Sequence, residues 1–211
     1  PDLAGRFSRG LFFDGEAHID PRKAIAALAD EVAAKGGTIR FGSDVEPADL
    51  DAGLVLDCRG LAARDVLPEL RGVKGEMLIL RSDEIALARP VRLLHPRIPL
   101  YIVPRADGHF MVGATMIESS ARRRVSARSV LELLGAAYAL HPAFAEAEIV
   151  EIGTDARPAF PDNLPRLVRR GRVMHVNGLY RHGFLLGPAL ARMAADAVLH
   201  PETRPELLHD L

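Results

Sequence analysis

Residues 176–189, VNGLYRHGFLLGPA, combine a short apolar strand, a glycine-bearing turn and the start of an alanine-rich helix. The first backbone amides of a helix have no intrahelical acceptor, and the helix dipole favours negative charge beside them. Such a helix start suits a phosphate or any ligand region that becomes anionic. An ordinary β-turn-α connection, packed closely through the alanines that follow, explains the same spacing. The segment alone leaves both interpretations open.

Apolar periodicity upstream of this segment indicates an α/β unit. A helix is expected from Pro21 to about Lys35, with Asp20 as its N-cap and Gly36-Gly37 as its stop. Strands are expected at residues 10–13, 38–41 and 54–57.

The middle of the chain favours an antiparallel sheet, with short strands at 74–80, 91–95, 100–105 and 109–115. Asp107-Gly108 can supply the positive φ angles of a two-residue hairpin turn. Counting back from that turn places Tyr101 opposite Ala114. Alternation then puts four residues on one face, which either lines a ligand pocket or belongs to the core. They are Tyr101, Val103, Ala114 and Met116.

Elements expected after the sheet are a helix at 126–140, strands at 148–154 and 172–176, and a helix at 184–199. Arg157 follows one of these strands and precedes a proline. Arginine can grip a carboxylate with two parallel hydrogen bonds, although a surface arginine paired with an acid explains the position equally. The order α/β, antiparallel β, α/β is that of a substrate domain inserted into a nucleotide-binding domain.

Composition excludes several functional classes. The 211 residues carry a formal net charge of -1, which gives no reason to expect nucleic acid or an anionic membrane as a partner. No apolar run approaches the ~20 residues that span a bilayer. One cysteine allows no internal disulfide, and a cytoplasmic location is expected. No metal site is expected, and Arg122-Arg123-Arg124 is expected to be a solvated loop.

Common phosphate-binding and hydrolase motifs are absent from the sequence. The chain has no Gly-x-Gly-x-x-Gly or Walker loop to cradle a phosphate, and no Gly-x-Ser-x-Gly elbow for hydrolysis. It also has no initiating Met and no signal pattern at Pro1–Arg6, so the natural start is expected to lie upstream.

Three motifs together resemble the D-amino-acid oxidase superfamily of flavoenzymes, and within it the glycine oxidases of thiamine biosynthesis. Residues 101–105 with 112–116 resemble the substrate-domain hairpin of that family. Residues 156–159 resemble its Gly-Leu-Arg-Pro segment, with Asp155-Ala156 in place of Gly-Leu. Residues 178–189 resemble its flavin-contacting turn and helix, with His182 where some relatives have Asn. A weaker match over 19–60 extends the resemblance along nearly the whole chain.

The resemblance implies a role for individual residues. Arg157 would bind the substrate carboxylate, with the Tyr101 hydroxyl as a second donor. Met116 would line the substrate pocket, and Arg181 would lie near both flavin and substrate. The implied FAD contacts are Val45, Cys58, Arg59, Gly60, Gly178, Arg181, His182, Gly183, Phe184, Leu185 and Leu186.

The implied fold is α/β plus α+β, a partial Rossmann-like FAD-binding domain with an inserted antiparallel substrate domain. Its expected boundaries are 1–72 and 159–211 for the FAD-binding parts and 73–158 for the substrate domain. The first third of such an enzyme, with its glycine-rich loop, is expected to be absent. This chain alone would then bind FAD poorly and be inactive.

The implied activity is oxidative deamination of glycine, sarcosine or small D-amino acids. Noncovalent FAD would receive a hydride, and O2 would reoxidise it to give H2O2. The resemblance also implies self-association. An amine dehydrogenase that uses a carrier acceptor, and an inactive module that retains the fold, are the alternatives. The presence of Tyr101, Arg157 and Arg181 together argues against the second.

Overall fold

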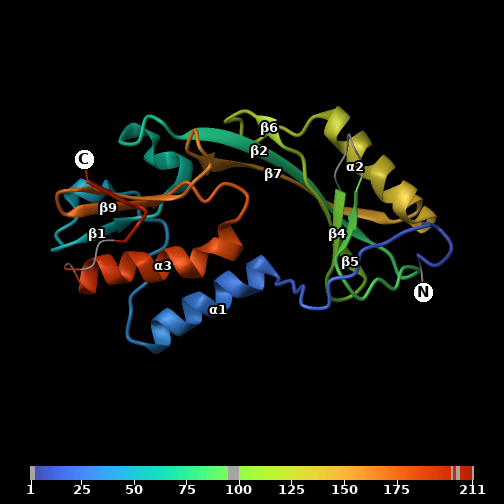
Figure 1. Cartoon of the computed structure of the whole chain (residues 1–211), viewed down its shortest axis with the longest axis horizontal. Coiled ribbons are helices and arrows are strands. Elements are labelled where there is room, and N and C mark those ends of the chain that lie inside the picture. Colours follow the sequence, from blue (N-terminus) through green and yellow to red (C-terminus); the bar gives the residue numbers. More distant parts are fainter. Residues whose placement is uncertain (1–2, 95–99, 201, 203–204, 211) are drawn as a thin grey trace. The chain divides into compact units, whose positions relative to one another are not determined.

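The structure is a computed structural model that describes residues 3–94, 100–200, 202 and 205–210 (Figure 1). The chain forms two compact units. Unit 1 comprises residues 1–24, 74–117 and 121–155, and unit 2 comprises residues 25–73, 118–120 and 156–211. Both contain strands and helices, so the mixed α/β character expected from the sequence is confirmed. The domain boundaries at residues 72 and 158 stay a prediction.

A six-stranded sheet carries the core of unit 1. Its order is β3-β4-β5-β2-β6, and β7 also pairs with β2. The strands are β2 (Arg71–Arg81), β3 (Val91–Leu93), β4 (Leu100–Pro104), β5 (His109–Gly113), β6 (Ile117–Glu118) and β7 (Glu148–Ala159). The expected strands at 74–80, 100–105 and 109–115 are present with shifted ends. Of the strand expected at 91–95, β3 accounts for the first part, and His95 lies outside the described residues.

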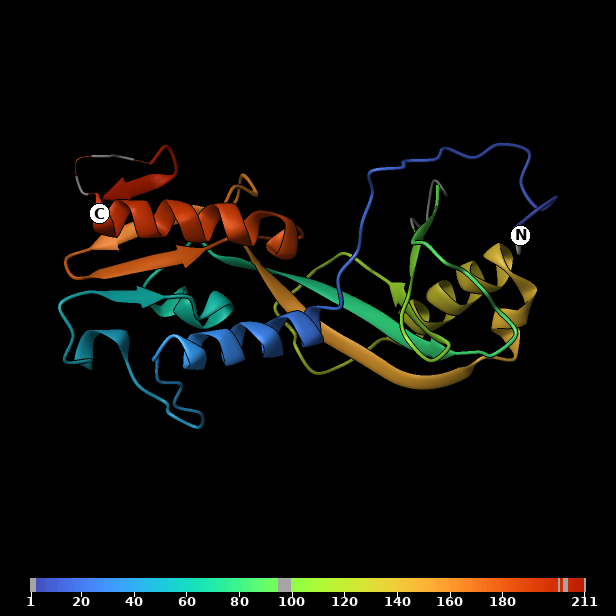
Figure 2. The ribbon, with the colours of Figure 1, turned by 90° about the horizontal axis from the view of Figure 1, so that it is seen from below.

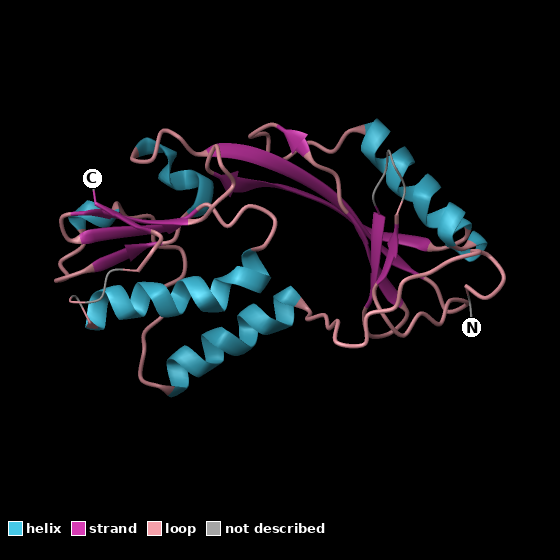
Figure 3. Cartoon of the chain, viewed as in Figure 1, coloured by secondary structure: helices cyan, strands magenta, loops and turns pink. Residues whose placement is uncertain are grey.

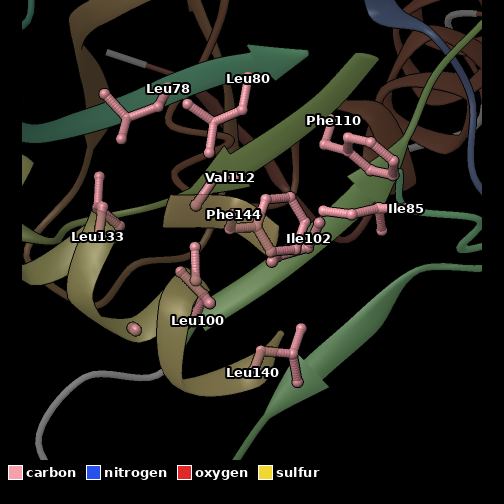
Figure 4. Packing of buried hydrophobic residues seen from close by; sticks show 12 residues of the cluster. Leu78, Leu80, Ile85, Leu100, Ile102, Phe110, Val112, Leu133, Leu140 and Phe144 are labelled. Atoms are coloured by element: carbon pink, nitrogen blue, oxygen red, sulfur yellow. The ribbon is translucent and has the colours of Figure 1, made fainter. Parts of the chain in front are cut away.

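Helix α2 (Ala127–Leu140) packs on one face of this sheet, as Figure 3 shows for the helix and the strands beneath it. Ser126 caps the helix, because its side chain accepts a hydrogen bond from the Ser129 amide. Alternate residues of β2 point toward α2, so Leu78 and Leu80 are fully buried in the cluster drawn in Figure 4. The short 3-10 helix η3 (Pro142–Ala145) adds Phe144, whose ring meets that of Phe110 edge-on at 5.4 Å.

A buried ion pair lies where β2 meets the start of α2. The Glu76 carboxylate is fully buried, contacts the Lys74 ammonium and accepts the Ser126 amide at 3.2 Å. The Lys74 ammonium also donates to the Arg124 carbonyl. Lys74 and Glu76 therefore have the ion pair and the hydrogen bonds that buried charges require.

The β4–β5 hairpin corrects the expected register. Asp107 and Gly108 have φ angles of 58° and 68°, and the His109 amide donates to the Ala106 carbonyl at 3.2 Å, so the two-residue turn is confirmed. The Arg105 amide also donates to the His109 carbonyl, at 2.7 Å. Two residues therefore oppose His109, a bulge that shifts the ladder by one. Tyr101 pairs with Gly113 rather than with Ala114.

Unit 2 contains a four-stranded sheet in the order β1-β9-β8-β10. The strands are β1 (Val55–Asp57), β8 (Arg166–Arg170), β9 (Val173–Asn177) and β10 (Leu208–Asp210). β1 runs parallel to β9 and β10 parallel to β8, whereas β8 and β9 form an antiparallel hairpin. Helix α3 (Gly183–Leu199) lies along this hairpin in Figures 1 and 2, and its Leu190 and Ala194 pack on Leu167 and Met174.

Helix α1 (Pro21–Ala34) begins where the sequence predicts, because Asp20 accepts hydrogen bonds from the amides of Arg22 and Lys23 at 3.0 and 3.2 Å. None of its residues is buried. The 3-10 helices η1 (Pro47–Asp49) and η2 (Gly60–Asp65) follow it along the chain. The strands expected at 10–13 and 38–41 are wrong, since neither segment pairs with another strand.

Candidate functional site

The parallel pair β1 and β9 places two loops at one edge of the sheet in unit 2. Asp57, the last residue of β1, pairs with His175 of β9. The turn Cys58–Gly60 leaves β1 at this edge, and residues 178–182 leave β9 there before α3 begins at Gly183. The carboxyl ends of parallel strands are where α/β sheets bind ligands. The two turns for which the resemblance implies cofactor contacts therefore lie at the same edge of the sheet, and the contacts themselves stay a prediction.

A buried asparagine joins these turns. Asn177 is only 2% exposed, and its Nδ2 donates to the Gly60 carbonyl at 2.9 Å. Its Oδ1 accepts the Gly178 amide at 2.8 Å. Gly178 has a φ of +82°, and a Cβ there would lie 2.3 Å from the Phe160 ring. The turn after β9 thus requires glycine at this position.

The buried carboxylate of Asp57 stabilises the Cys58–Gly60 turn through hydrogen bonds. Asp57 accepts the Arg59 amide at 3.0 Å, the Arg59 guanidinium at 3.1 Å and His175 Nδ1 at 2.9 Å. Burial alone would raise the pKa of the Asp57 carboxyl, but the hydrogen bonds from Arg59 and His175 outweigh it and hold the pKa below its ordinary value. Asp57 is therefore an anion that fixes the Cys58–Gly60 turn.

The start of α3 presents backbone amides that come before its first helical hydrogen bond. The first helical hydrogen bond runs from the Leu186 amide to the His182 carbonyl at 2.8 Å, and no side chain caps the helix. The amides of Gly183, Phe184 and Leu185 precede that bond. A Cβ on Gly183 would meet nothing within 4 Å, so a planar ligand has room to approach. These features fit an electron-rich ring edge of the kind that FAD presents.

The structure corrects the setting of Arg157. This half-buried residue lies within β7, which runs on to Ala159, rather than beyond the end of a strand. The Tyr180 amide donates to the Pro158 carbonyl at 3.0 Å. The strand that carries Arg157 is therefore hydrogen-bonded to the turn that carries the exposed Arg181.

Tyr101 and Met116 belong to the other unit. The Tyr101 ring lies over Gly113, where a Cβ would be 3.1 Å from the phenol oxygen. Met116 follows β5 and is 47% exposed. Their role beside Arg157 stays a prediction.

Val45 lies on a loop near the Cys58–Gly60 turn. It is 50% exposed and precedes Glu46, whose carboxylate lies 3.5 Å from the Arg59 guanidinium. That ion pair brings the loop of Val45 toward the Cys58–Gly60 turn. The Cys58 side chain is a free thiol.

The sequence interpretation missed Asn177, and gave no role to Asp57 or His175. A usable signal was the position of Asn177 at the end of a strand and before a glycine, since Asn side chains bond to nearby backbone. The partner Gly60 is 117 residues away, however, and no local pattern identifies it.

A cavity of about 370 Å³ lies elsewhere, in unit 1. Its walls are His18, Asp20, Lys23, Leu87, Ala88, Pro104, Arg105 and Ala106. None of the sequence-derived site residues lines it. In the part of the chain that the structure describes, no cluster of three His, Cys, Asp or Glu residues could hold a metal ion. The helices described are also too short or too polar to cross a bilayer.

The structure defines a mixed α/β protein in which the parallel strands β1 and β9 end at one edge of a sheet. A family model described as FAD dependent oxidoreductase matches residues 1–197, and the chain belongs to this family. A protein of Rhizobium etli named as the thiamine biosynthesis oxidoreductase ThiO is 56% identical over 206 residues, which cover 98% of this chain and 63% of that protein. The glycine oxidase of Geobacillus kaustophilus is 31% identical over 98% of this chain and 60% of its own length.

Solved structures agree on the fold. The crystal structure of glycine oxidase from Geobacillus kaustophilus superposes with a TM-score of 0.71 at 29% identity, over 86% of this chain and 54% of that one. The chain thus spans less than two thirds of the length of the relatives it matches.

Proposed function

We propose that the protein carrying this chain is a flavin-dependent oxidase that deaminates glycine or another small amino acid or amine. The observation that carries the proposal is the gathering of β1, β9, α3 and β7 at one edge of unit 2. There the Tyr180–Pro158 hydrogen bond joins the strand of Arg157 to the turn that opens α3. The likeness to glycine oxidase supports the choice of substrate class.

In this proposal the residues of the chain bind and orient the substrate. The Arg157 guanidinium forms two parallel hydrogen bonds to the substrate carboxylate, and the Tyr101 hydroxyl donates a third. Clamping the carboxylate fixes the substrate Cα, so much of the rate acceleration comes from positioning. Arg181 adds positive charge beside the same place. Met116 forms part of an apolar wall that limits substrate size.

FAD would supply the redox chemistry when bound: the substrate amine would lose a hydride and a proton to become an imine, which water hydrolyses, and O2 would be reduced to H2O2. The amides of Gly183, Phe184 and Leu185 and the positive end of α3 stabilise negative charge on the ligand they face. The turn Cys58–Gly60 holds the adenine side. Binding is noncovalent in this proposal, so acid precipitation of the yellow protein should leave all the flavin in the supernatant.

Two assays test the activity. The protein carrying this chain should bleach its flavin spectrum anaerobically with glycine or sarcosine, and in air it should release one H2O2 per amine consumed. Bleaching without peroxide, together with turnover on an artificial acceptor, would instead identify a dehydrogenase. Absence of bleaching with glycine, sarcosine and D-alanine would reject the oxidase proposal. The 211-residue chain by itself should bind FAD weakly, because it contains no Gly-x-Gly-x-x-Gly loop.

A further inference from the structure

We infer that Asn177 is a positioning residue for the cofactor, whose carboxamide sets the spacing between the Cys58–Gly60 turn and the turn that opens α3. The inference rests on the proposed function, because it assumes that both turns contact FAD. Asn177 would act on FAD only through the backbone of the two turns, and it would not contact the substrate.

The contacts of Asn177 are made entirely within unit 2. Its Nδ2 donates to the Gly60 carbonyl at 2.9 Å while its Oδ1 accepts the Gly178 amide at 2.8 Å. The residue is 2% exposed, so its carboxamide is largely shielded from water. One planar group therefore ties the loop after β1 to the loop after β9.

This link needs both ends of a carboxamide. A carboxylate of the same shape accepts the Gly178 amide, but it cannot donate to a carbonyl. A serine hydroxyl is too short to reach Gly60 while it caps the glycine next to it. Neighbouring groups make the rest of the edge rigid, since the Phe160 ring fills the space beside Gly178 and Asp57 holds Arg59. Beyond the pairing of β1 with β9 and the Asp57–His175 hydrogen bond, Asn177 adds a direct side-chain link between the two turns.

The physical consequence concerns affinity. A rigid pair of turns binds a long dinucleotide without first being ordered, and preorganisation of this kind raises affinity. When the donor is lost, the Gly60 carbonyl loses this partner and the side-chain link between the two turns is broken. FAD should then bind about tenfold more weakly or worse, as expected for one buried hydrogen bond.

The test compares two Asn→Asp changes in the protein that carries this chain. Asn177→Asp removes the donor to Gly60. Asn163→Asp makes the same chemical change in an exposed turn, where the side-chain oxygen that accepts from Arg71 is kept. FAD is titrated into each apoprotein and its dissociation constant is read from the quenching of flavin fluorescence. The melting temperature of each apoprotein is recorded alongside.

A pH series makes the readout specific. At pH 8 Asn177→Asp should bind FAD about tenfold more weakly than Asn163→Asp, with a similar melting temperature. Burial raises the pKa of a carboxyl, and the protonated form regains a donor. The gap between the two variants should therefore narrow as the pH falls to 5. Asp57, Arg59 and His175 lie at the same edge of the sheet and are unchanged in both variants, so the ratio of the two constants reports the position of the introduced carboxyl group.

Asn177→Ser provides a second route, because it removes the link without adding a charge. Equal FAD affinity in the variants at positions 177 and 163 would overturn the inference while leaving the proposed function intact. Failure of both position-177 variants to fold would also overturn it, since the residue would then act on stability. An unsubstituted protein that binds no FAD would instead reject the proposed function itself.

Discussion

The ring of Tyr101 lies over the backbone of Gly113, its partner across β4 and β5. A Cβ at Gly113 would come within 3.1 Å of both the phenol oxygen and the ring carbon that bears it. The absence of a side chain at Gly113 therefore sets where the hydroxyl group of Tyr101 can lie.

Gly113→Ala should displace that hydroxyl and raise the KM for amino acids about tenfold, as expected for a lost hydrogen bond to a charged group. Tyr101→Phe should have a similar effect. Gly135→Ala on α2, where a Cβ meets nothing within 4 Å, is the matched control and should leave KM unchanged. Steady-state kinetics would contradict the role of Tyr101 if all three variants behaved alike.

Arg157→Ala should raise the KM for amino acids about a hundredfold, because it removes two charge-assisted hydrogen bonds to the carboxylate. The KM for an amine substrate without a carboxylate should change far less. Arg128→Ala on the exposed side of α2 removes a guanidinium that lies 3.8 Å from Glu132. This control variant should leave the KM for both substrates unchanged. An unchanged KM in the Arg157 variant would reject its binding role.

Gly178→Ala should destabilise the protein by about 2–4 kcal/mol, since a methyl group would clash with Phe160 and adopt a strained backbone. Gly171→Ala separates the two causes. Gly171 also has a positive φ, of +57°, but a Cβ there meets open space, so only about 1 kcal/mol should be lost. Urea unfolding measures both values, and equal losses would mean that the contact with Phe160 adds nothing.

Glu76→Gln should cost about 3–5 kcal/mol at pH 7, because it leaves the buried Lys74 ammonium without its partner. Burial raises the pKa of the Glu76 carboxyl, but hydrogen bonds from Lys74, Ser129 and the Ser126 amide prevail and hold the pKa below its ordinary value. A lowered pKa stabilises the fold above the unfolded value and loses that effect as the pH falls through the folded value.

The difference in unfolding free energy between Glu76→Gln and the unsubstituted protein should therefore be largest at neutral pH. It should shrink below about pH 4.3, the ordinary pKa of a glutamate. Glu132→Gln on the surface of α2 is the control for loss of a glutamate charge. Urea unfolding at pH 7 and pH 3.5 checks the trend, and a gap that grows at low pH would contradict it.

Local signals in the sequence predicted local structure well. Asp20 caps a helix where expected, and Asp107-Gly108 forms its turn, because each depends on groups a few residues away. Features that depend on distant partners were not predicted. The bulge opposite His109 moved the register of Tyr101 by one residue. The segment 38–41 has strand-like residues but finds no neighbouring strand.

The candidate site divides in the same way. Periodicity and turn residues predicted the strand that ends at Asp57 and the last helix, and both are present with their starts shifted by one residue. The cofactor contacts of Gly60, Gly178 and Gly183 stay predictions. The groups that hold them together were not visible, since Asn177 and His175 act across more than a hundred residues. The cytoplasmic location, self-association and the electron acceptor stay predictions.

The mixed pairing of β9 has a consequence for folding order. β9 meets β8 across the turn at Gly171, whereas its parallel neighbour β1 lies 118 residues away between Asp57 and His175. Short loops close faster than long ones, so the hairpin should form early and β1 should dock late. The edge of the sheet that carries the two turns should then be among the last parts of unit 2 to form during refolding.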